Sequence, residues 1–370
     1  MQVVFMKETT NMKKLNLSLA FLALAAMSVN AQTSVNSQPV GYVNVKIIAG
    51  TGSSKKLSYI SLPLLDKGFS ITGKTQGTIT GVTSTTITDS TAGWTAGALS
   101  APATPYLIQI KSGTALGRIF HIASNATTGG AVGALASANT ATSVTISTLD
   151  TGSGISDLVA AGVAVGDSYE IYGCDTLSSA LGSPSTTGIV SGSSAGVADT
   201  VVVVVNGAAS TYFHNGTRWT KVFAGNPDAS NAPLLPNLGF SYSRLGNTDI
   251  VLSPVGSVPT IARKVQIKNA GLTLLSVYYP ADATLASLGL QNTPGWTGNT
   301  SSALADKVVL VSSTGSASTY WYTGVRWQKV FAGSPAADTT VVPAGAMVYI
   351  NKIGAATGFS TFTQALPYTL

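Results

Sequence analysis

The side chains that most often carry catalysis or hold metals are scarce in this chain. It contains two histidines (His121 and His214), one cysteine (Cys174) and two glutamates (Glu8 and Glu170). None of these residues lies at a spacing that zinc sites use, and no run of alternating Asp and Asn resembles a calcium loop. The sequence therefore predicts no metal site and no cofactor.

Two short patterns resemble catalytic groups. Gly192-Ser-Ser-Ala-Gly196 matches G-x-S-x-G with Ser194 at its centre, but that motif works at a strand-to-helix turn of an α/β sheet, and here it lies in a Ser/Gly-rich loop. Asp167 and Glu170 are the closest pair of acids. Glycosidases need two opposed carboxylates in a cleft, whereas neighbours on one short segment point poorly for that. We find no catalytic residue and interpret the chain as a non-enzyme.

The remaining reactive side chains have structural interpretations. His121 lies within Arg118–Ile122, where a strand position is expected. Cys174 stands between Gly173 and Asp175, and a lone cysteine of this kind is usually a small buried apolar residue. With one cysteine the chain has no internal disulfide, so its core must supply the stability.

The N-terminus has the pattern of a secretory signal peptide. Met12-Lys13-Lys14 is a short positive segment, Leu15–Met27 is mostly apolar, and Val29-Asn30-Ala31 supplies small residues ahead of a cut before Gln32. The apolar run is too short to span a bilayer. We expect residues 1–31 to be a signal peptide, with 1–11 as an upstream start extension. The processed chain should then have no transmembrane segment and reach the periplasm, cell surface or extracellular space.

Charge is sparse along the chain. Loss of residues 1–31 removes three lysines and one glutamate, so the net charge falls from +6 to +4. The nearest approach to a basic cluster is Arg263-Lys264 with Lys268, which we interpret as a solvated strand edge. Nucleic-acid binding is not expected, because it requires clustered cations that displace counterions.

Short runs of alternating β-branched residues predict an all-β chain. They occur at Tyr42–Ile47, Ser143–Ser147 and Val265–Lys268, and Val201–Val205 suits a strand buried on both faces. Two segments, Asp157–Val163 and Leu177–Leu181, could form one or two helical turns.

The most informative feature is a repeat at an offset of 108 residues. Ser210–Gly225 and Ser318–Gly333 are identical at eleven of sixteen positions, and Thr176-Leu177 recurs as Thr284-Leu285. His214 becomes Tyr322 in the second copy, so the module does not need a histidine there.

A weaker echo at an offset of 215 relates Val40-Gly41, Leu57 and Ser61 to Val255-Gly256, Leu272 and Ser276. It suggests that N-terminal strands complete the first module. We therefore predict two related β modules, sandwich or barrel-like, with an inserted or additional small β domain. The expected parts are a signal peptide (1–31), N-terminal strands of the first module (32–74), the inserted domain (75–172), the first repeat module (173–253) and the second repeat module (254–370).

The repeated segment predicts a hairpin. Asn215-Gly216 between two strand-like runs is a strong signal for a two-residue turn, which would place Tyr212 opposite Trp219 and Phe213 opposite Arg218. In the second copy the same register places Tyr320 opposite Trp327 and Trp321 opposite Arg326. The preferred interpretation is a ladder that packs on the module core. The alternative is a row of exposed aromatics that stacks on sugars, with candidate ligand contacts at Tyr212, Trp219, Arg218, Tyr320, Trp321, Arg326 and Trp327.

The hairpin motif, Thr211–Gly225 and Thr319–Gly333, and the preceding segments Thr176–Gly182 and Thr284–Gly289 resemble a family of uncharacterised secreted β-repeat proteins known mainly from verrucomicrobial bacteria. Residues 75–172 also resemble small β modules of phage-tail and appendage proteins. The resemblance implies export but no activity and no site residue.

Three hypotheses for function follow. The first is an exported, non-enzymatic protein of the cell surface or extracellular space with a structural or interaction role, whose partners are envelope or matrix proteins or glycans. The second is a carbohydrate-binding protein that uses the Tyr/Trp/Arg hairpins. The third is a hydrolase that depends on Ser194 or scattered aspartates. Exposure of Trp219, Trp321 and Trp327 discriminates between the first two.

Overall fold

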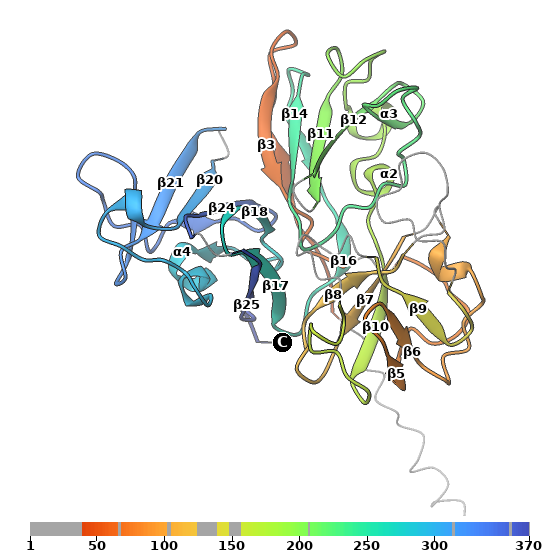
Figure 1. Cartoon of the computed structure of the whole chain (residues 1–370). Helices are drawn as coiled ribbons and strands as arrows, with labels where there is room; N and C mark the ends of the chain where they lie inside the picture. The colour runs from red at the N-terminus through yellow and green to blue at the C-terminus, as the bar shows by residue number, and fades with distance from the viewer. Residues whose placement is uncertain are drawn as a thin grey trace, which may run out of the picture. The chain divides into compact units, whose positions relative to one another are not determined.

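The computed structural model describes residues 39–65, 68–101, 105–123, 139–147, 157–205, 208–312, 315–354 and 357–369. The predicted signal peptide lies outside these residues. Antiparallel sheets dominate the described ranges and helices are few and short (Figure 1). The predicted all-β class is therefore confirmed. No helix within these ranges is long and apolar enough to cross a membrane.

The first module is built on a five-stranded antiparallel sheet. Its order is β13 (Trp219–Lys221), β12 (Ala208–His214), β11 (Thr200–Val205), β14 (Phe240–Arg244) and β3 (Lys56–Ile60). A second, two-stranded sheet joins β2 (Val45–Ile47) to β15 (Ile250–Leu252). The inward side chains of both sheets share one hydrophobic core, as in a β-sandwich.

The second module has the same strand order. Its five-stranded sheet runs β22 (Trp327–Lys329), β21 (Ala317–Tyr322), β20 (Lys307–Val311), β24 (Met347–Lys352) and β18 (Gly271–Ser276). A two-stranded sheet joins β17 (Arg263–Lys268) to β25 (Phe359–Gln364), and the short strands β19 (Ala283–Thr284) and β23 (Val341–Val342) pair beside them. β3 thus occupies in the first module the position that β18 occupies in the second.

The strands between β3 and the first helix form two further sheets. One runs β4 (Gln76–Thr78), β10 (Ser168–Gly173), β7 (Tyr106–Ile110) and β8 (Ile119–His121), and the other runs β5 (Gly81–Val82), β6 (Thr86–Thr88) and β9 (Ser143–Thr145). Around them, a separate core gathers Trp94 and Tyr169 with aliphatic side chains. A 3₁₀ turn, η1 (Ala98–Ser100), completes this part.

Short helices close one side of each module. In the first, α2 (Leu177–Leu181) is followed by α3 (Pro184–Thr187), and in the second, α4 (Leu285–Leu288) is followed by the 3₁₀ turns η2 (Leu290–Asn292) and η3 (Ser302–Leu304). Capping boxes start α2 and α4, because Thr176 pairs with Ser179 and Thr284 with Ser287. The predicted helix at Leu177–Leu181 is present, whereas Asp157–Val163 forms turns instead of a helix.

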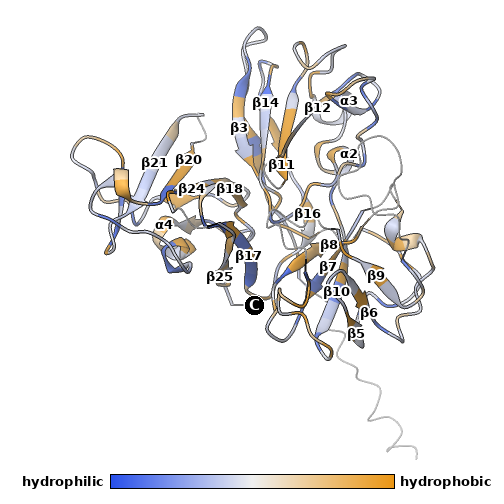
Figure 2. Cartoon of the chain, in the orientation of Figure 1, coloured by the Kyte–Doolittle hydropathy of each residue, from blue (hydrophilic) through white to orange (hydrophobic). Residues whose placement is uncertain are grey.

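Central strands are the most apolar. Figure 2 shows β11 and β20 mainly in hydrophobic colours, whereas β3 and β17 carry hydrophilic segments. The expectation that Val201–Val205 is buried on both faces is only partly met. Val201, Val203 and Val205 point into the core, but Val202 and Val204 are half-buried. One face of β11 is therefore only partly buried, although its composition suggests burial on both faces.

The two modules meet through contacts that occur twice. Ser61 N donates to Gly345 O at 2.8 Å, and Ser276 N donates to Asn237 O at 3.3 Å. Ser61 and Ser276 are equivalent residues of the two modules, as are Asn237 and Gly345. In the first bond the first module donates to the second, and in the second bond the second module donates to the first. Reciprocity of this kind is the mark of a two-fold interface.

The N-terminal strands repeat the same symmetry. β1 (Val40–Tyr42) pairs antiparallel with β16 (Val255–Ser257), its own equivalent in the second module, and Gly41 lies opposite Gly256 at the centre. The two halves of the chain therefore meet as the two subunits of a symmetric dimer would.

Arg263 reinforces this contact, which corrects its interpretation as a solvated residue. Its side chain is fully buried, and it donates to Ser276 O at 2.8 Å and to Asn237 O at 3.1 Å. The guanidinium also lies 5.0 Å from the ring centroid of Tyr278. Burial lowers the pKa of Arg263 to about 10, so the side chain keeps its charge at neutral pH. Only Lys264 and Lys268 keep the partial exposure expected of a strand edge.

Candidate functional site

The repeated hairpin has a different register from the one that the sequence predicts. Trp219 pairs with His214 instead of the predicted Tyr212, and Tyr212 pairs with Lys221. The loop therefore has four residues, 215–218, instead of two. The Asn215 side chain causes this, because its Oδ1 accepts from both Thr217 N and Arg218 N at 3.0 Å.

The second copy has the same four-residue loop, which a different side chain holds. Tyr322 pairs with Trp327, and Trp321 pairs with Gln328. Thr323 Oγ1 accepts from Val325 N and Arg326 N, as the asparagine does in the first copy. The predicted pairs of an arginine with an aromatic ring are therefore absent from both of these described hairpins.

The five candidate ligand-contact rings are buried. Trp219 is 1% exposed and Trp327 is 0% exposed, and the remaining three rings, Tyr212, Tyr320 and Trp321, are also buried. Their indole N–H groups are satisfied within the protein: Trp219 Nε1 donates to Gly182 O at 2.9 Å, and Trp321 Nε1 donates to Asn299 O at 3.1 Å. A ring in such a position holds the module together and cannot stack on a ligand in this conformation.

Aromatic neighbours complete the packing of each hairpin. The His214 and Trp219 rings meet edge to face with centroids 5.7 Å apart. In the second module, Trp327 meets Tyr322 at 5.6 Å and Trp296 at 5.8 Å. The substitution of His214 by Tyr322 therefore preserves a ring beside the tryptophan, which is a packing role.

The two candidate arginines are exposed at the hairpin loops. Arg218 Nη1 lies 3.8 Å from Asp228 Oδ2, and both side chains are about half exposed. In the second module the residue at the position of Asp228 is Ala336, so Arg326 has no equivalent acid. An exposed pair of this kind contributes about 0–1 kcal/mol to stability.

A buried acid in each module escaped the sequence analysis. Asp199 precedes β11 and pairs with Arg244 Nη1 at 2.5 Å, and its Oδ1 also accepts from Leu245 N at 2.6 Å. The same carboxylate accepts from Val190 N and from the Tyr242 hydroxyl. One buried charge thus joins a loop, a central strand and the end of β14.

The second module has the same arrangement at Asp306. Its carboxylate accepts from Thr297 N at 2.8 Å and from Ile353 N at 2.9 Å, and Lys352 Nζ lies 3.9 Å away. Burial lowers the pKa of Lys352, and the adjacent Asp306 carboxylate acts in the opposite direction. The sequence signal was a shared Ala-Asp before a valine-rich strand, at an offset of 107 instead of 108.

His121 and Glu170 lie in β8 and β10, two strands of one four-stranded sheet. Glu170 Oε2 lies 3.2 Å from Lys111 Nζ, its Oε1 accepts from Gln76 Nε2 at 2.8 Å, and the Tyr172 hydroxyl donates to it. His121 is buried in β8, as predicted for a strand position, and its Nε2 has no hydrogen-bond partner among the described residues. Both side chains are buried.

The remaining catalytic candidates are equally isolated. Ser194 is exposed in the loop before β11. Cys174 is buried and forms no disulfide. Nowhere in the described ranges do three or more His, Cys, Asp or Glu side chains come together to hold a metal ion.

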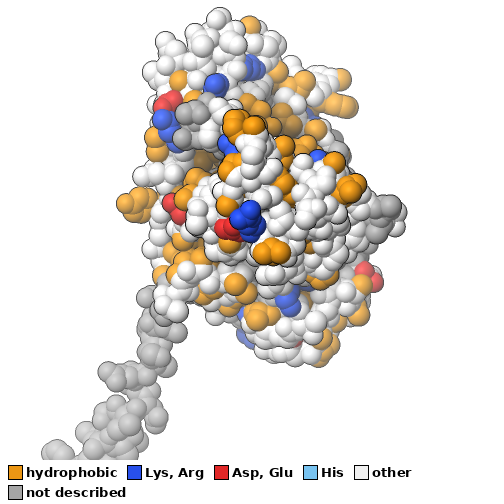
Figure 3. Space-filling view, turned by 90° about the vertical axis from the view of Figure 1, so that its left-hand side faces the viewer, with side chains coloured by type: hydrophobic (Ala, Val, Ile, Leu, Met, Phe, Trp, Pro, Cys, Tyr) orange, Lys and Arg blue, Asp and Glu red, His pale blue; other side chains and the backbone are white. Residues whose placement is uncertain are grey.

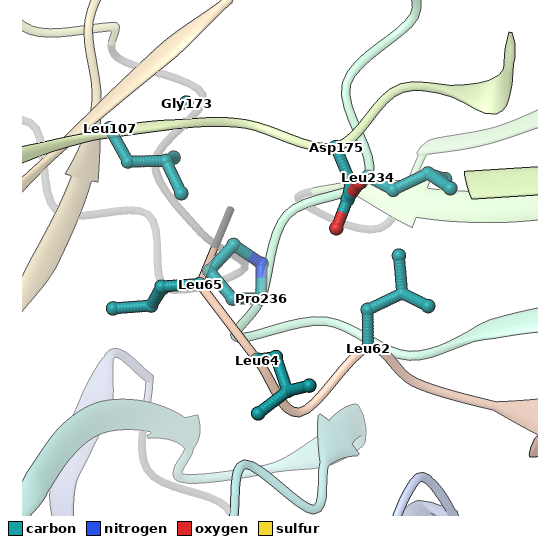
Figure 4. A pocket seen from close by; sticks show the side chains of 8 residues that line it. All are labelled: Leu62, Leu64, Leu65, Leu107, Gly173, Asp175, Leu234 and Pro236. Atoms are coloured by element: carbon teal, nitrogen blue, oxygen red, sulfur yellow. The ribbon is translucent and has the colours of Figure 1, made fainter. Parts of the chain in front are cut away.

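One recess lies where the segment after β3 meets β7 and the loop before β14. Its cavity volume is about 10 Å³, and leucine side chains form most of its wall (Figure 4). Pockets for small molecules usually measure roughly 300–1,000 Å³ and combine an apolar wall with several polar groups. This recess offers a single carboxylate, that of Asp175, and is too small for a substrate.

The turn that follows each hairpin is the part of the repeat that is exposed at the surface. Phe223 and Phe331 are both 69% exposed, and the preceding valines, Val222 and Val330, are exposed as well. Both turns belong to the identical Lys-Val-Phe-Ala-Gly segment. We call Lys221–Gly225 and Lys329–Gly333 the twin turns.

The backbone of the twin turns is the same in both modules. Asn226 N donates to Phe223 O and Ser334 N donates to Phe331 O, each at 2.9 Å. Asn226 and Ser334 have φ values of 44° and 45°, and they are the two non-glycine residues with positive φ in the described chain. Such conformations cost free energy in residues other than glycine and occur often at functional sites.

Charged residues make up 9% of the sequence. Figure 3 shows one face of the molecule, on which a few charged side chains lie scattered among polar and hydrophobic ones. Comparison of the chain with protein-family models, with curated proteins and with solved structures gives no match. The site must therefore be interpreted from its own geometry.

We predict that Trp219→Ala and Trp327→Ala each lower the free energy of unfolding by about 3–5 kcal/mol, because each leaves a large cavity and an unpaired carbonyl or amide oxygen. Thermal unfolding monitored by circular dichroism measures the effect. Val325→Thr is the matched control, since Val325 is 86% exposed in the same hairpin and the first module has Thr217 there. Unchanged melting of both alanine variants would contradict the structural role of the rings.

We also predict a loss of stability in acid that depends on His121. Complete burial lowers its pKa from 6.5 to about 4, so the unfolded chain takes up this proton before the folded one does. Stability is therefore full above pH 6.5 and falls as the pH drops toward 4, by about 3 kcal/mol. In His121→Gln, urea unfolding across this range should show a shallower fall. Equal pH dependence in the two proteins would show that His121 is not the group responsible.

Proposed function

We propose that the protein is an exported, non-enzymatic protein of the cell surface, periplasm or extracellular space, and that its role is to bind a partner through the twin turns. One observation carries the proposal: an exposed phenylalanine on the same strained turn, retained in both modules. Packing accounts for the other shared aromatic residues of the hairpin, since they are buried. Packing does not account for Phe223 and Phe331, each of which is 69% exposed.

The comparison of the two modules supports this assignment. A core position can change between copies, as in the substitution of Phe213 by Trp321, and identical core residues such as Trp219 and Trp327 are explained by their burial. An exposed position without a binding role is free to become polar, because surface substitutions usually change stability by less than about 0.5 kcal/mol. Phe223 and Phe331 have not become polar. Large exposed aromatic residues are typical anchors of interfaces.

The non-enzymatic part of the proposal is supported by the uses of the reactive side chains. Glu170 is engaged by Lys111 and Gln76, Asp199 is engaged by Arg244, and His121 is enclosed in β8. Each has a structural explanation that needs no substrate. Export rests on the pattern of residues 1–31, which the described residues do not include.

The carbohydrate-binding alternative loses its main support. It required Trp219, Trp321 and Trp327 on the surface, where sugar rings could stack on them. Their indole rings are buried instead. The two exposed arginines alone do not form a sugar platform.

The proposal predicts where the protein is found and what keeps it there. Fractionation and microscopy of the tagged full chain should place it beyond the inner membrane and in association with the cell envelope or matrix. Phe223→Ser combined with Phe331→Ser should release it into the soluble fraction without lowering its melting temperature. Val325→Thr should remain bound.

Recovery of the unaltered protein only as a soluble periplasmic monomer would count against the binding role. Retention of the double variant at the wild-type level would show that the twin turns are not the binding element.

A further inference from the structure

The twin turns combine an apolar tip with cations at its base. Val222, Phe223 and Ala224 form a continuous exposed apolar tip, and Lys221 directly precedes it. In the second module, Lys329 Nζ lies 5.9 Å from the ring centroid of Phe331. Arg326 in the hairpin loop of the second module adds a further positive charge, whereas Arg218 in the first module lies beside Asp228.

We propose that the partner of the twin turns is an anionic lipid bilayer. In this arrangement the phenylalanine rings enter the interface between headgroups and acyl chains, and the lysines face the headgroup phosphates. The inference rests on the proposed function and names the chemical class of its partner.

The chemistry of the tip favours a bilayer over a sugar. The phenylalanine ring has no polar atom, and valine and alanine beside it supply only hydrocarbon. Sugars are held by hydrogen bonds to hydroxyl groups around the stacked ring, and the tip offers no side-chain donor or acceptor for them. A bilayer interface accommodates an apolar tip with a lysine at its base. The hydrocarbon side chains can enter the boundary of the acyl chains while the lysine ammonium stays beside the headgroup phosphates.

The charge balance favours an anionic surface. The residues that the structure describes include 16 lysines and arginines and 11 acids. Three of these acids, Asp199, Asp306 and Glu170, are buried against Arg244, Lys352 and Lys111, so each pair contributes little field at the surface. The remaining 13 cations and 8 acids still give a positive balance. Anionic lipids attract surface cations with an energy that falls off within a Debye length.

The reciprocal contact between the modules explains how two turns can act together. Two points related by a two-fold axis lie at the same height along that axis, so a flat surface perpendicular to the axis meets both turns or neither. A bilayer is flat on the scale of this protein. One shallow anchor gives only marginal, reversible binding, whereas two anchors on one rigid body add their effects.

The test is co-sedimentation of the full chain with vesicles of phosphatidylcholine, with or without phosphatidylglycerol. We expect binding to the vesicles that contain phosphatidylglycerol and little binding to phosphatidylcholine alone. Phe223→Ser or Phe331→Ser should weaken binding about tenfold, and the two together by about a hundredfold. Lys221→Gln or Lys329→Gln should each cost about fivefold and reduce the salt dependence.

Two controls make the result specific. Val325→Thr should bind as the unaltered protein does, and every variant must melt at the wild-type temperature. Absence of binding to anionic vesicles, or equal binding of the double phenylalanine variant, overturns the bilayer proposal.

The outcome also separates the two proposals. If envelope retention depends on the phenylalanines but vesicles do not bind, the twin turns recognise a protein or a glycan, and only the bilayer inference fails. If neither retention nor vesicle binding depends on them, both proposals fail.

Discussion

The burial of one tryptophan in each module is the interaction on which the rest of the structure depends. Trp219 and Trp327 lie between the hairpin, the neighbouring short helix or 3₁₀ turn and the core of the five-stranded sheet, and their indole nitrogens bond to Gly182 O and Gln291 Oε1. Because the ring at the start of β13 or β22 is fixed inward, the chain that leaves the strand three residues later is held in a defined place. The exposed phenylalanine is presented from that fixed base.

A second constraint is electrostatic and also occurs once per module. Asp199 and Asp306 each gather two backbone amides and one buried cation. Removal of one partner from such a pair would leave an unpaired buried charge, which costs about 3–5 kcal/mol. These carboxylates join loops and strands within each module, and the reciprocal bonds of Ser61 and Ser276 join the two modules.

The sequence predicted the strands well and the side-chain register poorly. Alternation of apolar residues identified β9 and β17, since this signal is local. The hairpin register was wrong because Asn215-Gly216 favours a two-residue turn, whereas Asn215 Oδ1 instead binds two amides across a four-residue loop. A local motif does not reveal which of two such turns the packing of Trp219 selects.

The buried acids were missed for a different reason. Tyr212 lies thirteen positions after Asp199, but Tyr320 lies fourteen positions after Asp306. The shared acid therefore falls out of register with the hairpin repeat. Burial of the tryptophans was weighed correctly as the preferred interpretation, but the exposed phenylalanine was not recognised, because sequence identity between the copies does not distinguish a core position from a surface one.

Hydroxyl-radical footprinting with mass spectrometry, on the free protein and on the protein bound to cells, tests the central claim most directly. In the free protein, Phe223 and Phe331 should be oxidised rapidly while Trp219 and Trp327 are protected, although tryptophan is the more reactive residue. In the bound protein, the two phenylalanines should become protected. Rapid oxidation of the tryptophans, or phenylalanines that stay equally reactive when the protein is bound, would contradict the account.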